Sequence, residues 1–174
     1  MKKSAIVSMV IMCVMFSGLV LVQSTVAEKP EQGLRGLKGQ AGNSNNAFIE
    51  LWQKDPATWE IVEDGAWGKL KYNLAGAEFE FLFNGHGLEP GAEYSLIIYN
   101  DPWPGTGSVL LASGTACEYG NIHLAGSIEL GADLADAKIW LVLSSDFDGS
   151  QMVGWNPTEY LFEYDLISYD DTDV

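Results

Sequence analysis

Apolar and polar side chains alternate with a period of two along residues 69–83, with one interruption near position 75. Alternation of this kind predicts a β-strand with one buried face and one solvated face. The stretch therefore predicts two neighbouring strands, on either side of Ala75-Gly76. Their apolar positions are Leu70, Tyr72, Leu74, Phe79, Phe81 and Phe83.

These two strands predict a hairpin with a defined register. If Ala75-Gly76 is the loop, Tyr72 lies opposite Phe79 on the buried face, and Lys71 lies opposite Glu80 on the solvated face. Aromatic pairs and pairs of opposite charge both stabilise directly opposed positions on neighbouring strands. The two faces therefore agree on the same register.

Further segments rich in β-branched and aromatic residues are separated by turn residues about every ten positions, which is typical of a β-sandwich or barrel. We expect an all-β fold, an antiparallel β-sandwich of about seven to eight strands. Two of the segments are apolar on both sides, as central strands covered on both faces would be: 94–99 and 139–143. The remaining segments are 109–112, 122–130 and 160–167.

The N-terminal residues have the pattern of an export signal. Two lysines precede an uncharged run over residues 5–22, and small residues follow at Thr25 and Ala27, where a signal peptidase reads them. We expect a signal peptide over residues 1–27 and a secreted, extracellular or cell-surface protein. The alternative is an uncleaved anchor, because ~18 apolar residues can also span a bilayer. In that case this segment is the part that contacts the membrane.

Glycine recurs at every third position from Gly33 to Gly42. Because no proline occupies the intervening positions, a flexible tether is favoured over a collagen triple helix. The predicted organisation is thus a signal peptide over 1–27, a Gly-rich linker over 28–47 and a β-sandwich domain over 48–174.

The chain is strongly acidic, with a formal net charge of −15. Removal of the signal peptide takes away lysines and no acidic residue, so the exported chain is more acidic still. Nucleic-acid binding draws most of its affinity from Lys and Arg on phosphates, and this charge therefore excludes nucleic acid as a partner.

Cys117 is the one cysteine of the sequence outside the predicted signal peptide. It has no second cysteine with which to close an internal disulfide. It follows a run of small residues, and a small residue in such a run is most often buried. We therefore predict that Cys117 lies in the core.

Three segments of the chain have a distinctive composition: residues 84–99, which begin Asn84-Gly-His-Gly; residues 101–105, Asp-Pro-Trp-Pro-Gly; and residues 154–164, which begin Gly-Trp-Asn-Pro. In these segments the chain resembles an uncharacterised group of exported proteins of methanogenic archaea. The resemblance extends over most of residues 59–169. It implies export and a β-sandwich, and it implies no activity.

The loop over residues 100–108 holds Trp103 between two prolines. Proline restricts the backbone, and loops at the ends of a sandwich are common binding sites. Because a rigidly held indole can stack against a sugar ring, we predict a ligand site at Trp103 and Asp101, with a cell-surface glycan or protein as the partner. The alternative is that Trp103 folds back and closes the end of the sandwich.

Asp146 and Asp148 lie two positions apart, ahead of Gly149, which resembles part of a calcium loop. The match lacks a third acidic or amide residue before the glycine and a bidentate Glu after it. Calcium at Asp146 and Asp148 is the metal that the sequence suggests, and no other cofactor is expected. A solvated turn is the alternative interpretation.

His86, His123 and Cys117 lie in no catalytic signature, so no catalytic residue is assigned. We expect an exported, non-catalytic binding or interaction module. The alternative is a secreted hydrolase or metal-dependent enzyme whose site is assembled from distant loops. A concave pocket with convergent carboxylates or histidines would favour the enzyme, and a flat aromatic patch would favour the binding module.

Overall fold

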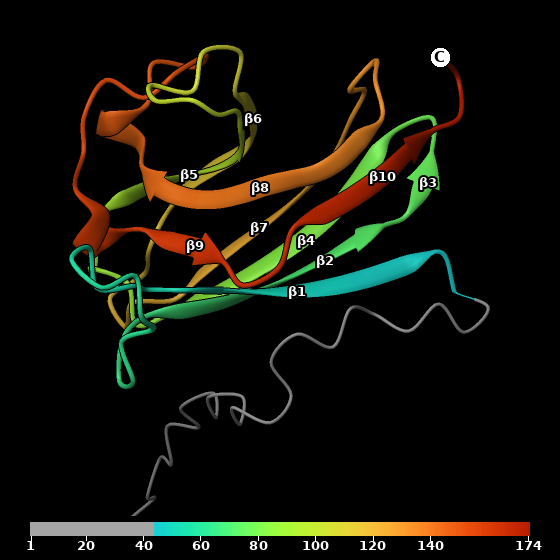
Figure 1. Ribbon diagram of the computed structural model, residues 1–174. Coiled ribbons are helices and arrows are strands. Elements are labelled where there is room, and N and C mark those ends of the chain that lie inside the picture. Colours follow the sequence, from blue (N-terminus) through green and yellow to red (C-terminus); the bar gives the residue numbers. More distant parts are fainter. Residues whose placement is uncertain (1–43) are drawn as a thin grey trace, which may run out of the picture.

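The computed structural model describes residues 44–174 (Figure 1). The predicted signal peptide and most of the predicted linker lie outside the described residues. The described part of the chain contains ten strands and two short 3₁₀ helices. In chain order these are β1 (Asn46–Trp52), β2 (Trp67–Asn73), β3 (Ala75–Gly76), β4 (Phe79–His86), β5 (Glu93–Tyr99), β6 (Val109–Thr115), β7 (Ile122–Ile128), β8 (Leu134–Leu143), η2 (Ser144–Asp146), η3 (Pro157–Glu159), β9 (Leu161–Glu163) and β10 (Ile167–Asp171).

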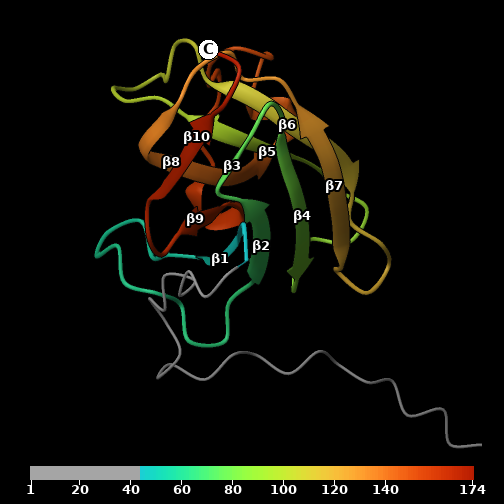
Figure 2. The ribbon, with the colours of Figure 1, turned by 90° about the vertical axis from the view of Figure 1, so that its right-hand side faces the viewer.

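The strands form one mixed sheet that folds into two facing layers (Figures 1 and 2). One layer contains β1, β2, β4 and β7, and the other contains β5, β6, β8 and β10. The short strand β9 pairs with both β1 and β8 and so joins the layers at one edge. The all-β class predicted from the sequence is confirmed. The described strands number ten because two of them, β3 and β9, are very short, and β10 pairs with β3 in parallel.

The main core fills the space between the two layers. Each strand contributes the apolar side of its alternation, as Leu70 does from β2, Phe83 from β4 and Leu141 from β8. All three side chains are fully buried. Burial of large apolar side chains is the dominant favourable contribution to folding, so this alternation fixes which face of each strand points inward.

A second apolar cluster covers the outer face of β5 and β8. These two strands are buried on both sides, as the sequence predicted: Leu96 and Leu141 point into the main core, whereas Ile97 and Trp140 belong to the second cluster. The cover comes from the chain that follows β8. Its buried members are Phe147, Met152, Tyr160 and Phe162.

The predicted hairpin register is wrong by two residues. Tyr72 pairs with Phe81, and Lys71 pairs with Leu82 rather than Glu80. The reason is that Ala75–Gly76 pairs with β10 as strand β3 and therefore cannot form a tight hairpin loop. A shift of two keeps every side chain on its own face, so the predicted buried and solvated sides are still correct.

The predicted burial of Cys117 is also wrong, because this residue is exposed. It lies in the turn between β6 and β7, where its amide donates to the Asn121 carbonyl at 2.8 Å and its carbonyl accepts from the Gly120 amide at 2.9 Å. The neighbouring Ala116 occupies the buried position instead.

Two element boundaries differ from the sequence prediction. Strand β1 begins at Asn46, so it includes the last two residues that were placed in the linker. The predicted strand over 160–167 is divided into β9 and β10. Between them the Tyr164 amide donates to the Glu50 carbonyl at 2.9 Å, and the chain then leaves β1 to pair with β8.

Candidate ligand-binding site

A pocket of about 560 Å³ opens on the outer face of β5 and β8. This volume is within the usual range of small-molecule sites, about 300–1,000 Å³. Most of the residues that line it are aromatic, and two are charged. They are Trp59, Tyr99, Asp101, Trp103, Lys138, Trp140 and Trp155.

The floor of the pocket is a stacked aromatic pair. Tyr99 pairs with Lys138 across β5 and β8, and Trp140 lies two residues further along β8, so all three side chains share one face. The rings of Tyr99 and Trp140 are nearly parallel, at 10°, with centroids 3.6 Å apart. The Trp140 ring also contacts the Phe162 ring edge-on, with the two centroids 5.2 Å apart, which anchors the floor to the second apolar cluster.

Three tryptophans from three different loops form the walls. Trp59 and Trp103 are each 50% exposed, and Trp155 is 42% exposed. Trp103 and Trp155 meet in a T-shaped arrangement with centroids 5.1 Å apart, and Trp59 lies 6.4 Å from Trp155. Large aromatic side chains are mostly buried in folded proteins, so a group of three exposed indoles, two of them packed against Trp155, is an unusual feature of this surface.

The loop that carries Trp103 is held close to the pocket floor. The Gly105 amide donates to the Pro102 carbonyl at 2.8 Å, and the Ser108 hydroxyl binds both the Gly105 carbonyl and the Asn100 amide. Gly105 has a φ of +78°, and a Cβ there would collide with the Tyr99 ring. Glycine at this position therefore allows the loop to approach the floor.

Asp146 anchors the segment that carries Trp155. Its buried carboxylate accepts hydrogen bonds from the Asn156 side-chain amide at 2.8 Å and from the Tyr160 hydroxyl. Its carbonyl accepts from the amides of Val153 and Gly154, at 2.8 and 3.2 Å. Burial, together with the Asp146 carboxylate, raises the pKa of Tyr160, which stays a neutral donor. These bonds fix the backbone on both sides of Trp155.

Asp148 is exposed and stabilises a tight turn. One carboxylate oxygen accepts from the amides of Ser150 and Gln151, both at 2.9 Å, and these bonds lower the pKa of Asp148. The two carboxylates of the predicted calcium loop are thus bonded to different protein groups. Residues 44–174 contain no group of three or more His, Cys, Asp or Glu side chains that could hold a metal ion. Calcium at Asp146 and Asp148 stays a prediction.

The fold brings together the two loops that the sequence treated as separate sites. The Gly107 amide donates to the Ser150 carbonyl at 3.0 Å, and the Met152 amide donates to the Pro104 carbonyl at 2.8 Å. The turn stabilised by Asp148 therefore supports the Trp103 loop. The predicted ligand residues Trp103 and Asp101 line the pocket, and the predicted metal residues Asp146 and Asp148 are not among its lining residues.

Trp59 comes from the loop between β1 and β2. Its φ of +59° is unusual for a bulky residue, and local hydrogen bonds maintain it: the Trp59 amide donates to the Asp55 carbonyl at 2.7 Å, and the Asp55 carboxylate accepts from Ala57 and Thr58. The ring rests edge-on against Phe162 at 5.2 Å. Backbone outliers of this kind are frequent at functional sites.

A charged pair completes the pocket. The Lys138 ammonium lies 2.5 Å from the Asp101 carboxylate, and both side chains are partly open to solvent, at 33% and 60%. Burial and the nearby Asp101 charge raise the pKa of Tyr99, which therefore stays protonated beside them.

Sequence reasoning missed Trp59, Lys138 and Trp155 as pocket residues. Trp155 lies in a segment that the sequence marked as distinctive, but nothing there indicated that it would meet Trp103. Lys138 lies in the pocket because it pairs with Tyr99 across β5 and β8, and the sequence does not show that these two strands pair.

Glu163 lies behind the pocket, where β9 joins the two layers. Burial raises its pKa to about 7, although the Lys54 and Lys138 charges and a hydrogen bond with Trp140 act in the opposite direction. The Lys54 ammonium donates to the Glu163 carbonyl at 2.9 Å, and burial lowers the pKa of Lys54. This group does not line the pocket, but it titrates next to its floor.

The two histidines lie on the other layer. His86 is hydrogen-bonded to the Asn121 amide oxygen at 2.8 Å, and His123 to that of Asn84 at 2.7 Å. Asn84 and His86 share the outer face of β4, and His123 pairs with Asn84. Each histidine thus has its own asparagine partner, and neither lines the aromatic pocket.

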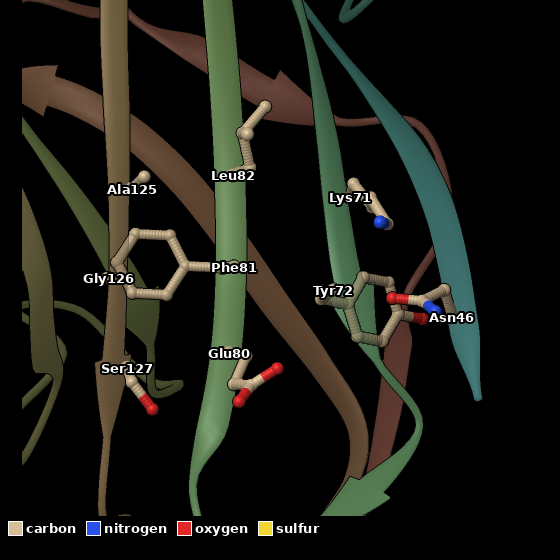
Figure 3. Close-up of a pocket in the computed structure, with 9 residues that line it drawn as sticks. All are labelled: Asn46, Lys71, Tyr72, Glu80, Phe81, Leu82, Ala125, Gly126 and Ser127. Carbon is tan, nitrogen blue, oxygen red and sulfur yellow. The ribbon is translucent and has the colours of Figure 1, made fainter.

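A second hollow, of about 360 Å³, lies over β2, β4 and β7 (Figure 3). It differs from the aromatic pocket in its polar lining, with the Lys71 ammonium on one side and Glu80 and Ser127 on the other. Its lining residues come from strands β1, β2, β4 and β7. Its remaining lining residues are Asn46, Tyr72, Phe81, Leu82, Ala125 and Gly126.

No family model, no curated protein and no solved structure matches this chain. The resemblance to exported proteins of methanogenic archaea therefore stays a prediction. Within residues 44–174, no helix has the length and apolar character needed to cross a membrane.

Proposed function

We propose that this protein is an exported, non-catalytic binding module whose aromatic pocket holds a carbohydrate. The observation that carries the proposal is the group of three half-exposed tryptophans, Trp59, Trp103 and Trp155, around the Tyr99 and Trp140 floor. The apolar CH face of a sugar ring stacks on aromatic rings, while its hydroxyl groups remain available to polar groups at the rim.

The exposure of these indoles has a cost that a ligand would offset. An indole that leaves roughly 100 Å² of apolar surface in water forgoes about 2.5 kcal/mol of burial free energy. The loops around Trp103 and Trp155 are nevertheless held by many hydrogen bonds in a form that displays the rings. A rigid, displayed aromatic surface binds a ligand with little loss of conformational entropy.

The charges at the pocket favour binding over hydrolysis. Glycoside hydrolysis generally requires two carboxyl groups about 5–9.5 Å apart on either side of the bond that breaks. Among the described residues that line the pocket, Asp101 is the acidic one, and it is paired with Lys138. The hydrolase alternative would need a second carboxylate from outside this lining.

The N-terminal sequence pattern supports export of this module, so its ligand would be an extracellular or cell-surface glycan. A surface protein with apolar side chains is the competing partner, because an aromatic pocket can also accept such a segment.

The test is a titration of the purified protein with a panel of soluble glycans, followed by tryptophan fluorescence and calorimetry. We expect at least one glycan to bind, and we expect Trp103→Ala and Trp155→Ala to abolish binding with little change in the melting temperature. Tyr119→Ala is the matched control, because Tyr119 is 76% exposed and lies outside the pocket. Equal losses in the control and the pocket variants, or no binding by any glycan, would exclude the proposal.

A further inference from the structure

The charged pair at the pocket places a hydrogen-bond acceptor and a donor side by side. The Asp101 carboxylate and the Lys138 ammonium are 2.5 Å apart, and both remain partly open to the pocket. The carboxylate has a second oxygen that can accept, and the ammonium has three donors, of which the pair uses one.

This spacing fits two hydroxyl groups on adjacent carbons of a sugar ring. Adjacent hydroxyls in the gauche arrangement lie about 3 Å apart, close to a hydrogen-bond distance. One hydroxyl can therefore donate to Asp101 while its neighbour accepts from Lys138. Hydrogen bonds to charged groups contribute about twice as much as neutral ones, so such a pair would orient the ring above the aromatic floor.

The same pair disfavours a charged sugar. The opposite charges of Asp101 and Lys138 cancel at the pocket, within a chain whose net charge is −15. A uronate carboxylate would meet Asp101 and the acidic protein as a whole, and it would have to displace Asp101 to reach Lys138. An amino sugar would gain from Asp101 but would bring its own ammonium against Lys138.

We infer that the pocket is selective for neutral pyranose rings, which it binds through two adjacent hydroxyl groups on Asp101 and Lys138 and through their apolar face on the tryptophans. This inference rests on the proposed carbohydrate function and names the class of sugar.

The experiment measures the affinity of the full exported protein for nine methyl glycosides. These are the gluco-, galacto- and manno-configured sugars, each as the neutral hexoside, the uronide and the 2-amino-2-deoxy sugar. We expect a neutral member to bind best, and its uronide to bind at least about tenfold more weakly. A deoxy analogue of the best neutral sugar, measured in addition, lacks one of the two hydroxyls and should bind about tenfold more weakly than that sugar.

Two variants should change the preference in opposite directions. Asp101→Asn leaves Lys138 unpaired, so the uronide should gain on the neutral sugar. Lys138→Gln leaves Asp101 unpaired, so the amino sugar should gain instead. Glu80→Gln and Lys71→Gln are the matched controls, because they change the net charge equally at the polar hollow and should leave the preference unchanged.

The outcomes separate this inference from the proposed function. Preferential binding of a uronide or an amino sugar by the unaltered protein would overturn the inference and leave carbohydrate binding intact. Equal shifts in the pocket and control variants would also overturn it, because they would reflect net charge rather than the pair. If no member of the three classes binds, the inference fails, and the wider glycan panel decides whether carbohydrate binding fails with it.

Discussion

The two outer faces of this molecule are built from similar strands and differ in what covers them. On β2 and β4 the outward positions are mostly polar or charged, as at Lys69, Lys71 and Glu80, and the apolar Leu82 among them is exposed. On β5 and β8 the outward positions Ile97, Trp140 and Val142 are apolar and buried, and the loops around them carry exposed tryptophans. The outer face of β2 and β4 is therefore open to solvent, whereas the outer face of β5 and β8 carries an additional apolar layer that displays aromatic side chains.

This difference is visible in the sequence pattern. A strand that alternates needs no cover on its polar side, and a strand that is apolar on both sides must find two partners. On β5 and β8 the second partner is a set of loops, and loops positioned on a rigid scaffold commonly carry binding residues. The continuous apolar runs therefore indicated which strands are covered on both faces.

The largest effect on stability is expected from Asp146→Ala, which acts on the segment that covers β5 and β8. The substitution removes the carboxylate partner of the buried Tyr160 hydroxyl and of the Asn156 side-chain amide, and we expect a loss of about 3–4 kcal/mol in unfolding free energy. Urea denaturation measures it. Asp148→Ala is the control, and its exposed carboxylate should matter much less. Equal losses would contradict the anchoring role of Asp146.

The next effect concerns Glu163 and pH. Its pKa is raised to about 7 in the folded state, so folding binds a proton that the unfolded chain releases near pH 4.5. The contribution of Glu163 to the unfolding free energy is fully present below about pH 4.5 and is lost as pH rises to about 7. The unfolding free energy changes by about 2–3 kcal/mol across this window. Glu163→Gln should flatten the stability curve across this window in thermal unfolding experiments. An unchanged pH dependence would contradict the assignment.

A comparison of two glycines tests the close approach of the Trp103 loop. Gly105 and Gly91 both have positive φ, at +78° and +79°, but the space around Gly91 is open. Gly91→Ala should cost about 1 kcal/mol from the backbone, whereas Gly105→Ala should cost about 2 kcal/mol and displace Trp103 from the floor. Denaturation reports the first effect, and the change in tryptophan fluorescence relative to a Trp103→Ala control reports the second. Identical behaviour would mean that the loop does not rest on Tyr99.

The smallest effect on stability is expected on the outer face of β2 and β4. Lys71 pairs with Leu82 rather than with Glu80, so Lys71→Glu places no like charge directly opposite. We expect a change within about 0.5 kcal/mol in unfolding free energy. A larger loss that Glu80→Lys restores would support the register inferred from the sequence and contradict the one in the structure.

The sequence predicted the all-β class and the buried side of the strands, because both follow from the local alternation. It missed the register at Ala75–Gly76 because the partner of that segment, β10, lies near the other end of the chain. Cys117 was assigned to the core from its small neighbours, and the turn to Asn121 places it outside. Local composition does not show which long-range pairing a segment will make.

The site was predicted in part for the same reason. The prolines around Trp103 indicated a rigid loop, and its indole is half-exposed rather than buried in the end of the sandwich, whereas ligand binding there stays a prediction. The meeting of Trp103 with Trp155 depends on hydrogen bonds between two loops far apart in the sequence. Trp59 comes from a third loop whose conformation includes a positive φ, which the sequence does not reveal.

The most direct test of the central claim uses the six tryptophans of the chain as probes. In a nitrogen-15 correlation spectrum each indole gives its own resonance, and titration with the neutral glycosides shows which rings the ligand touches. We predict shifts at Trp59, Trp103 and Trp155. We predict no shift at Trp67, which lies on β2 and does not line the pocket. Shifts confined to Trp67, or a spectrum that no glycan changes, would contradict the assignment of the aromatic pocket as the binding site.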